Sequence, residues 1–375
     1  LGLDYQIVHN RSELMVLPTG VSKATGLHAA LEAMGISCHS TVGMGDAEND
    51  FALLEYCEIG VAVGNAIPSL KEYADLVLTQ PGTRAVAEFL AREVTRGIPA
   101  VQPRRRQVHL GTADNGDTVA IPASRVQVFV DGASGSGKSY LAGLFVENLI
   151  KDGYSVCVLD MEGDHVNLCD MSGALVLGGR EPLPPPDQVS RLLRHRFGSV
   201  VIDMALREPT LKYAYARDVL DHLTRLRQDC GLPHWICIEE AHMVPVDSIV
   251  CAQASGSLCL VTYRPEWLAK AMAASPEICI TALGDGLAEL RSAADSFPAR
   301  RFQAAPRALD HVRHHRKYAD ICVRTRRVLP SGTGRAWSAS TSGKSRTKPG
   351  NAGKRTASCS AKPASWPQSL RKLSP

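Results

Sequence analysis

Gly132-Ala-Ser-Gly-Ser-Gly-Lys-Ser139 decides the fold of this chain, because it is a complete G-x-x-x-x-G-K-[ST] phosphate loop. An apolar run at 126–130 leads into the loop, and residues 140–149 continue with a helical pattern. A strand, a glycine-rich loop and a helix in this order are the context in which the motif binds phosphate. We predict a nucleotide site here; the alternative interpretation is a Gly/Ser-rich surface turn.

The residue types of the loop suit phosphate chemistry. Glycine lets the backbone curl so that successive N–H groups point at phosphate oxygens, and the following helix offers its positive N-terminal end to the same anion. Lys138 would reach the β- and γ-phosphates during catalysis, and Ser139 would ligate Mg²⁺. The sequence therefore predicts ATP and Mg²⁺ as cofactors. The residues expected to hold the nucleotide are Gly132, Ser134, Gly135, Ser136, Gly137, Lys138, Ser139 and Thr262.

Two consecutive carboxylates follow a second apolar run, in Trp235-Ile-Cys-Ile-Glu-Glu-Ala-His242. A phosphate loop needs such an acidic strand end beside the phosphates, to hold the Mg²⁺ shell and the attacking water. We predict that Glu239 binds the Mg²⁺ shell and that Glu240 orients or deprotonates the water. A solvated acidic loop after a strand is the alternative.

The next apolar run ends in Thr262-Tyr-Arg-Pro265. The hydroxyl of Thr262 could sense the γ-phosphate, and Arg264 could act within the chain or toward a neighbouring subunit. Polar residues commonly terminate strands, so both residues keep a purely structural alternative. The motif Val158-Leu-Asp-Met-Glu-Gly-Asp-His165 ends another predicted strand, where ligands of open α/β sheets bind, but no catalytic role is assigned to it.

Apolar runs alternate with helical patterns over residues 119–322, which predicts an α/β domain with a mainly parallel sheet. Its candidate strands are 126–130, 155–160, 199–203, 235–239, 257–262 and 278–282. Before it, residues 93–118 combine a linker-like basic run at 103–106 with Asn115-Gly116, which predicts a β-hairpin. Residues 1–92 form a first α/β segment, and residues 323–375 form a tail.

The composition is that of a globular protein, with 45% hydrophobic and 21% charged residues. No apolar run approaches the ~20 residues that span a bilayer, so no membrane partner is predicted. The eleven cysteines form no C-x-x-C pair, which favours a cytoplasmic location. Residues 331–375 carry nine Lys and Arg residues and no acidic residue. This basic tail is predicted to be disordered, with a nucleic-acid-binding arm as the alternative.

The phosphate loop, the motif at 158–165, Glu-Glu-Ala-His at 239–242 and Val-Thr-Tyr-Arg-Pro at 261–265 follow one another in this order. Together with the upstream hairpin they resemble the HerA/FtsK-like P-loop ATPases, over about residues 107–320. The resemblance implies a RecA-like core, Mg²⁺-dependent ATP hydrolysis, a homo-oligomeric ring and translocation of DNA. Glu239 stands where the family usually has an Asp.

A second constellation lies in residues 1–92. The stretch Val42-Gly-Met-Gly-Asp-Ala-Glu-Asn-Asp50 ends an apolar run with carboxylates and an amide, which are oxygen donors that suit Mg²⁺ beside a phosphate. Lys23 precedes a helical pattern and could neutralise a phosphoryl group, and Asn65 follows a further apolar run. Taken alone, the Gly-Asp-x-x-Asn-Asp pattern could also be a helix-capping loop.

This constellation resembles the C-terminal part of haloacid dehalogenase-type phosphatases of the Cof-like, sugar-phosphatase subgroup, over about residues 3–92. The resemblance implies a Rossmann-like fold, a phosphate site at Lys23 and Asn49, and Mg²⁺ ligands at Asp46 and Asp50. The family's nucleophile is the first Asp of Asp-x-Asp-Gly, and no such motif precedes Lys23. Without it no phospho-aspartyl intermediate forms, so we expect this segment to be inactive as a phosphatase.

We expect a truncated product of a two-domain protein, in which a phosphatase remnant is fused to an ATP-hydrolysing domain. Out-of-frame translation would explain the abrupt change of composition after Cys322. Two other classes of function stay open. One is a sugar-phosphate-class phosphatase regulated by its nucleotide-binding domain, and the other is a non-catalytic fragment or scaffold.

Overall fold

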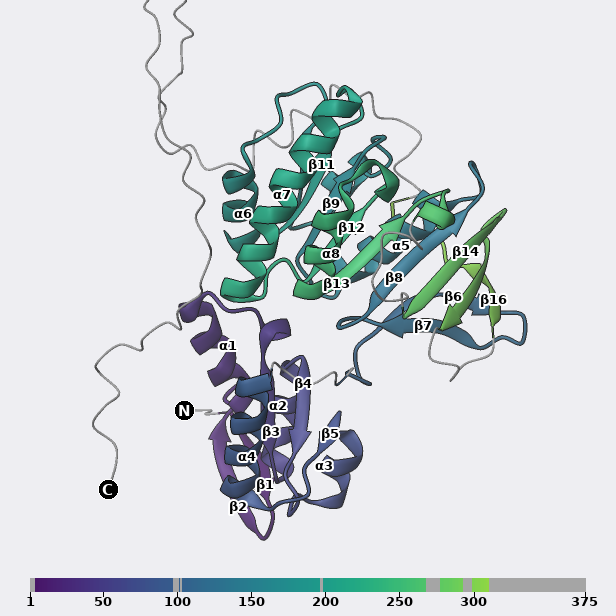
Figure 1. Ribbon diagram of the computed structural model, residues 1–375. Coiled ribbons are helices and arrows are strands. Elements are labelled where there is room, and N and C mark those ends of the chain that lie inside the picture. Colours follow the sequence, from purple (N-terminus) through teal and green to yellow (C-terminus); the bar gives the residue numbers. More distant parts are fainter. Residues whose placement is uncertain are drawn as a thin grey trace, which may run out of the picture. The chain divides into compact units, whose positions relative to one another are not determined.

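The computed structural model describes residues 4–96, 101, 103–195, 198–267, 277–292 and 299–309, which all belong to one compact unit of residues 1–329. The described residues have an α/β architecture (Figure 1). The predicted disordered tail lies outside them. Among the described helices, none is both long and apolar enough to cross a membrane.

The largest sheet has eleven strands in the order β10-β11-β9-β12-β13-β8-β14-β15-β16-β6-β7. Its first seven strands run parallel. They are β10 (Ala174–Gly178), β11 (Ser199–Asp203), β9 (Val156–Asp160), β12 (Trp235–Ile238), β13 (Ser257–Val261), β8 (Gln127–Gly132) and β14 (Ile278–Gly284). Because the carboxyl ends of parallel strands meet at one edge, the loops after β8, β9, β12 and β13 share that edge.

Helices cover both faces of this parallel region (Figure 1). Side chains alternate between the faces along each strand, as β12 illustrates. Trp235 and Cys237 pack in the cluster that contains α5, whereas Ile236 and Ile238 pack with α6, α7 and α8. All four side chains are fully buried, which explains why the strand reads as a continuous apolar run. The helices are α5 (Lys138–Lys151), α6 (Pro186–Arg194), α7 (Pro209–Cys230) and α8 (Val246–Ser255).

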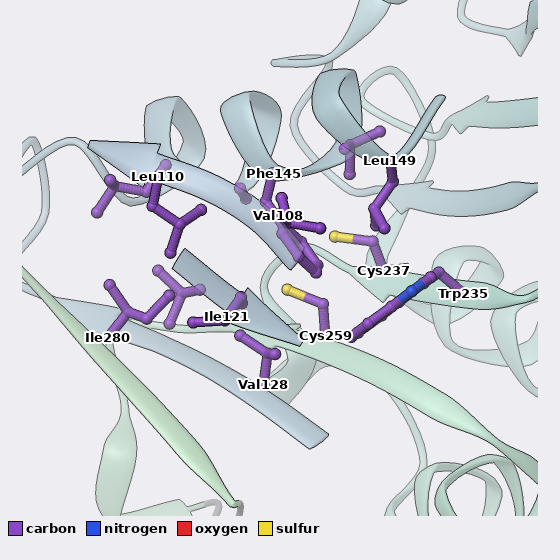
Figure 2. Close-up of a cluster of buried hydrophobic side chains, with 14 of the residues drawn as sticks. Val108, Leu110, Ile121, Val128, Phe145, Leu149, Trp235, Cys237, Cys259 and Ile280 are labelled. Atoms are coloured by element: carbon purple, nitrogen blue, oxygen red, sulfur yellow. The ribbon is translucent and has the colours of Figure 1, made fainter. Parts of the chain in front are cut away.

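The core beneath α5 fixes the helix that follows the phosphate loop. Figure 2 shows Phe145 and Leu149 pointing from this helix toward the strands. The Phe145 ring meets Trp235 edge to face, with ring centroids 4.8 Å apart. The indole N–H of Trp235 donates to the carbonyl of Ala123 at 2.7 Å, so this buried polar group is satisfied.

The remaining strands of the sheet are antiparallel, namely β15 (Leu287–Ser292), β16 (Arg300–Ala304), β6 (Gln107–Ala113) and β7 (Thr118–Pro122). The predicted hairpin is confirmed as β6–β7. At its tip, the Asn115 side chain accepts a hydrogen bond from the Asp117 backbone N–H at 3.1 Å. Gly116 has a φ of 86°, a conformation that glycine adopts without a steric cost.

The amino-terminal segment has two small sheets. β1 (Tyr5–Asn10) and β2 (Glu13–Pro18) form an antiparallel hairpin, and β3 (Val42–Gly45), β4 (Ile59–Ala62) and β5 (Leu76–Val77) form a parallel sheet. Its main helices are α1 (Lys23–Met34), α2 (Phe51–Tyr56), α3 (Pro68–Tyr73) and α4 (Gly82–Arg96). A small apolar cluster that includes Leu54 and Leu70, both fully buried, holds this segment together.

The basic run that reads as a linker is anchored to the amino-terminal segment. The guanidinium of Arg105 pairs with Asp75 at 2.7 Å, and the Asp75 carboxylate also accepts from the Gly60 backbone N–H. Arg104 donates to the Ala74 carbonyl, and Arg106 donates to carbonyls at the end of α2. The arginines therefore satisfy backbone oxygens of the amino-terminal segment.

Candidate functional site

The phosphate loop connects β8 to α5, as the sequence predicts. Gly132, Gly135 and Gly137 have φ values of 140°, 76° and 99°, in the region that other residues rarely adopt. A Cβ on Gly132 would lie 2.6 Å from the carbonyl oxygen of Ala282 on β14, so this position has room only for glycine. The loop ends at Gly137, the N-cap of α5, where unpaired backbone N–H groups and the helix dipole favour an anion.

Lys138 lies folded over the loop. Its Nζ donates to the Ala133 carbonyl at 2.9 Å, and the side chain is largely buried. The Nζ atom is 6.0 Å from the centre of the Tyr263 ring, so the cation reaches the loop after β13. The lysine that the sequence assigns to the phosphates is thus held at the mouth of the loop.

A pocket of about 380 Å³ adjoins the loop. Gly135, Ser136 and Tyr140 line one side, and Asp285, Leu287 and Gln303 of the β14–β15 and β16 region line the other. Its volume lies within the usual range for small-ligand sites. The pocket lies directly beside the glycine-rich backbone of the loop.

Glu239 follows β12 and pairs with a residue to which the sequence analysis gives no role. Its Oε1 lies 2.5 Å from Nε2 of His165, and neither side chain is exposed beyond 4%. Burial alone would lower the pKa of His165, but the Glu239 and Asp160 carboxylates outweigh it and raise the pKa to about 9. The histidine is therefore a cation that holds one oxygen of Glu239.

Asp160 positions His165. Its Oδ1 accepts from the backbone N–H groups of Glu162, Gly163 and Asp164, and its Oδ2 accepts from the N–H of His165. This fully buried carboxylate closes the turn after β9. Asp160 thus caps the loop that follows β9.

Glu240 differs from its neighbour in conformation and environment. Its φ of 46° is left-handed, which is costly for a residue with a Cβ. Its Oε2 is buried and has no hydrogen-bond partner within the described residues. Burial and the nearby Glu162 carboxylate raise the pKa of Glu240 to about 7, against the opposing charge of Lys138. Nδ1 of His242 lies 3.3 Å from this oxygen, and the oxygen keeps a lone pair that could accept from a water molecule.

Thr262, directly after β13, is fully buried. Its Oγ1 accepts from the backbone N–H of Arg264 at 3.1 Å and lies 2.9 Å from Nδ1 of His242. Arg264 itself is exposed, with its guanidinium 5.1 Å from the centre of the Tyr263 ring. The strand order β12-β13-β8 thus brings Glu239, Glu240, Thr262 and the phosphate loop to one sheet edge.

In the amino-terminal segment, Lys23 at the start of α1 forms an ion pair with Asp50 and lies 3.4 Å from Oδ1 of Asn49. The other oxygen of Asp50 accepts from the backbone N–H groups of Asp46 and Ala47. The predicted phosphate-site residues therefore come together, but Asp50 has both oxygens engaged.

Asp46 pairs with Arg11 at the tip of the β1–β2 hairpin, at 2.5 Å. Arg11 also donates to the Asn65 carbonyl, and its backbone N–H donates to Glu48. In the part of the chain that the structure describes, no three His, Cys, Asp or Glu side chains are grouped so as to hold a metal ion. These bonds do not fit a Mg²⁺ site at Asp46 and Asp50, whose metal role stays a prediction.

Three residues of these sites were missed by the sequence analysis. His165 and His242 lie inside the quoted motifs, yet a histidine beside acidic residues gives no sign of which carboxylate it contacts. Arg11 lies in a segment with no motif, 35 positions before Asp46 in the sequence. The two residues meet because the β1–β2 hairpin places Arg11 beside Asp46.

Two different segments of the chain match models of known protein families. Residues 6–90 match the family model of haloacid dehalogenase-like hydrolases. Residues 125–206 match the model of the helicase HerA central domain. The chain joins a haloacid dehalogenase-like segment to a HerA-like segment. Both resemblances stated from the sequence are confirmed, as is the α/β fold class.

The curated relatives match the haloacid dehalogenase-like segment. Phosphoglycolate phosphatase 2 of Saccharolobus solfataricus is 43% identical over 81 residues, which are 22% of this chain and 34% of that protein. The putative phosphatase YkrA of Bacillus subtilis is 47% identical over 66 residues, 18% of this chain and 25% of that protein. The chain spans about a third or less of the length of these two relatives.

Solved structures resemble both segments. VirB4 of Thermoanaerobacter pseudethanolicus has a TM-score of 0.43 at 10% identity and covers 54% of this chain and 97% of its own. A haloacid dehalogenase-like hydrolase from B. subtilis has a TM-score of 0.22 at 25% identity, over 26% of this chain and 33% of its own.

Proposed function

We propose that the HerA-like segment binds ATP with Mg²⁺ and hydrolyses it. The observation that carries this proposal is the convergence of three features at one sheet edge. They are a phosphate loop with three positive-φ glycines, Lys138, and the strained Glu240, whose Oε2 atom is buried 3.3 Å from His242 Nδ1. The anion-binding end of α5 accounts for the phosphates, and the adjoining pocket has the volume for the rest of a nucleotide.

The donor set fits one Mg²⁺ ion shared with phosphate oxygens. Magnesium is usually held by one or two protein oxygens, substrate phosphates and water. Ser139 and the second oxygen of Glu239 would provide the protein oxygens, since His165 engages Oε1. When bound, the ion would neutralise charge on the phosphates.

Each of the chain's own side chains would then have a separate role in ATP hydrolysis. Lys138 would leave the Ala133 carbonyl and move its charge to the β- and γ-phosphates. Glu240 would accept a hydrogen bond from the attacking water through Oε2 and orient or deprotonate it. The hydroxyl of Thr262 would contact the γ-phosphate. Buried charge and exclusion of water strengthen each of these interactions.

Calorimetric titration of the full chain with Mg²⁺-ATP tests the proposal. Lys138→Ala removes the cation that meets the phosphates, so ATP affinity should fall sharply. Equal affinity of wild type and Lys138→Ala would mean that the phosphate loop is not a nucleotide site.

We carry two further proposals by analogy with HerA-like proteins alone, namely assembly into a homo-oligomeric ring and action on DNA.

A second candidate function is a phosphatase activity of the amino-terminal segment. The 43% identity to a phosphoglycolate phosphatase and the convergence of Lys23, Asn49 and Asp50 favour an inherited phosphate site. Turnover of p-nitrophenyl phosphate or of sugar phosphates by the full chain would establish it. A non-catalytic scaffold would instead bind nucleotide without turnover of either substrate.

A further inference from the structure

His242 lies between the two groups that are proposed to act on the γ-phosphate and on the water. It belongs to the short helix Ala241–Met243, and its side chain is largely buried. Its Nδ1 is 2.9 Å from Oγ1 of Thr262 and 3.3 Å from Oε2 of Glu240. The ring packs edge to face on Tyr263, with centroids 4.9 Å apart, which fixes its orientation.

The surroundings of Nδ1 select one tautomer of this imidazole. A neutral imidazole carries its proton on either nitrogen, and the neighbouring acceptors decide which. In its proposed role as the base, Glu240 is an ionised carboxylate whose oxygens offer only lone pairs, so a bare Nδ1 lone pair 3.3 Å from its Oε2 would be repelled. The proton therefore belongs on Nδ1, from which it points toward Thr262.

This tautomer determines what the Thr262 hydroxyl can do. Its oxygen then accepts two N–H groups, from the Arg264 backbone and from His242. A hydroxyl has two acceptor lone pairs and one donor proton. With both lone pairs used, its proton is free to donate to another acceptor. In the opposite tautomer Nδ1 would take that proton itself.

We propose that His242 is a positioning residue that keeps the Thr262 hydroxyl as a donor to the γ-phosphate of a bound nucleoside triphosphate. The inference rests on the proposed function, because the donor has a target only when a triphosphate occupies the loop. It predicts that His242 and Thr262 together distinguish triphosphate from diphosphate, although His242 itself need not touch the nucleotide.

The test is the ratio of the affinities of the full chain for Mg²⁺-ATPγS and Mg²⁺-ADP, measured by calorimetry. A hydrogen bond to a charged group is worth about 1.5–3 kcal/mol, which corresponds to roughly 10- to 100-fold in affinity. His242→Ala and Thr262→Val should each lower the ATPγS/ADP ratio by about tenfold or more and leave ADP affinity near wild type. The double variant should be no worse than Thr262→Val, because both changes remove one interaction.

Conservative variants separate positioning from folding. Thr262→Ser keeps the hydroxyl and should keep the ratio, and His242→Asn can place an N–H near the Nδ1 position and should restore part of it. His195→Ala, at an exposed histidine after α6, is the matched control. Thermal melts show whether each variant folds. An unchanged ratio in a folded His242→Ala variant, or additive losses in the double variant, would overturn the inference.

The proposed function and the role of His242 can be refuted separately. If Lys138→Ala binds both nucleotides as well as wild type does, the proposed function fails. If Lys138 matters for both nucleotides but His242→Ala leaves their ratio intact, only the role of His242 is wrong.

Discussion

His165 Nε2 and Glu239 Oε1 lie 2.5 Å apart in a pair with almost no exposure to solvent. Asp160, the last residue of β9, closes the turn that carries His165, so the end of this strand positions the histidine. Glu239, the acidic residue after β12, is thereby fixed by the turn that follows the neighbouring strand β9.

The first prediction concerns the stability of this pair. His165→Ala leaves the buried Glu239 carboxylate without its partner, a change that typically costs about 3–5 kcal/mol. The free energy of unfolding from urea titration should fall by that order. The matched control is Asp187→Asn, which breaks the exposed pair with Arg191 on α6 and should lower the free energy of unfolding far less. Equal losses in the two variants would contradict the role assigned to His165.

The second prediction concerns Glu240. Glu240→Gln keeps the shape of the side chain but removes the base, so ATP binding should persist while hydrolysis falls by roughly 10²-fold or more. A coupled phosphate-release assay, combined with calorimetry on the same preparation, measures both quantities. Glu208→Gln, at an exposed glutamate before α7, is the control and should hydrolyse ATP at the wild-type rate. Loss of binding in Glu240→Gln would show that its charge serves the loop rather than the water.

The sequence predicts a strand correctly where its pattern of apolar residues matches its burial in the folded sheet. All six predicted strands are present, because buried parallel strands such as Ser199–Asp203 have an uninterrupted apolar centre. The strand Ala174–Gly178 was missed although it is as long as Ser199–Asp203 and largely apolar; glycines at or next to both of its ends also suit a turn. The antiparallel strands β15 and β16 were missed as well, since Leu287–Ser292 and Arg300–Ala304 carry charged residues.

The candidate site could likewise be predicted from the sequence only in part. Phosphate-loop geometry follows from glycine content, so the positive φ values of Gly135 and Gly137 could be anticipated. Side-chain pairing could not, because His165 and Glu239 are 74 positions apart and meet only through the strand order. The sequence equally gives no sign that Arg104–Arg106 are anchored, since a basic run has the same appearance in a linker.

The third prediction is a dependence of stability on pH at His39. This buried imidazole pairs with Glu58 at 2.7 Å. Burial alone would lower the pKa of His39, but hydrogen bonds to Cys38 and Glu58 outweigh it and raise the pKa to about 9. Burial alone would raise the pKa of Glu58, but His39 and the hydroxyls of Ser124 and Tyr154 outweigh it and lower the pKa.

The sign follows from linkage. A raised histidine pKa gives a stabilisation that is complete below the unfolded value, ~6.5, and is lost as the pH rises through about 9. The melting temperature should therefore fall between pH 6.5 and pH 9.5. His39→Gln removes the titrating group, so it should lower the melting temperature at pH 6.5 and flatten its decline. Parallel curves for wild type and His39→Gln would place the pH dependence elsewhere.

The last prediction concerns the amino-terminal segment. Lys23 and Asp50 converge, but Asp50 has both oxygens engaged and Asp46 is paired with Arg11. The stretch before Lys23 in this sequence has no Asp-x-Asp-Gly motif, which carries the nucleophile in the family that the segment resembles. We expect the full chain not to hydrolyse p-nitrophenyl phosphate or sugar phosphates with Mg²⁺ present.

The measurement is phosphate release, compared between wild type and Asp46→Asn. Turnover by wild type that Asp46→Asn abolishes would show that the segment is an active phosphatase, whereas turnover that survives this change would point to a contaminating enzyme. Glu240→Gln serves as the cross-control, because it should affect ATP hydrolysis and leave any sugar-phosphate turnover unchanged.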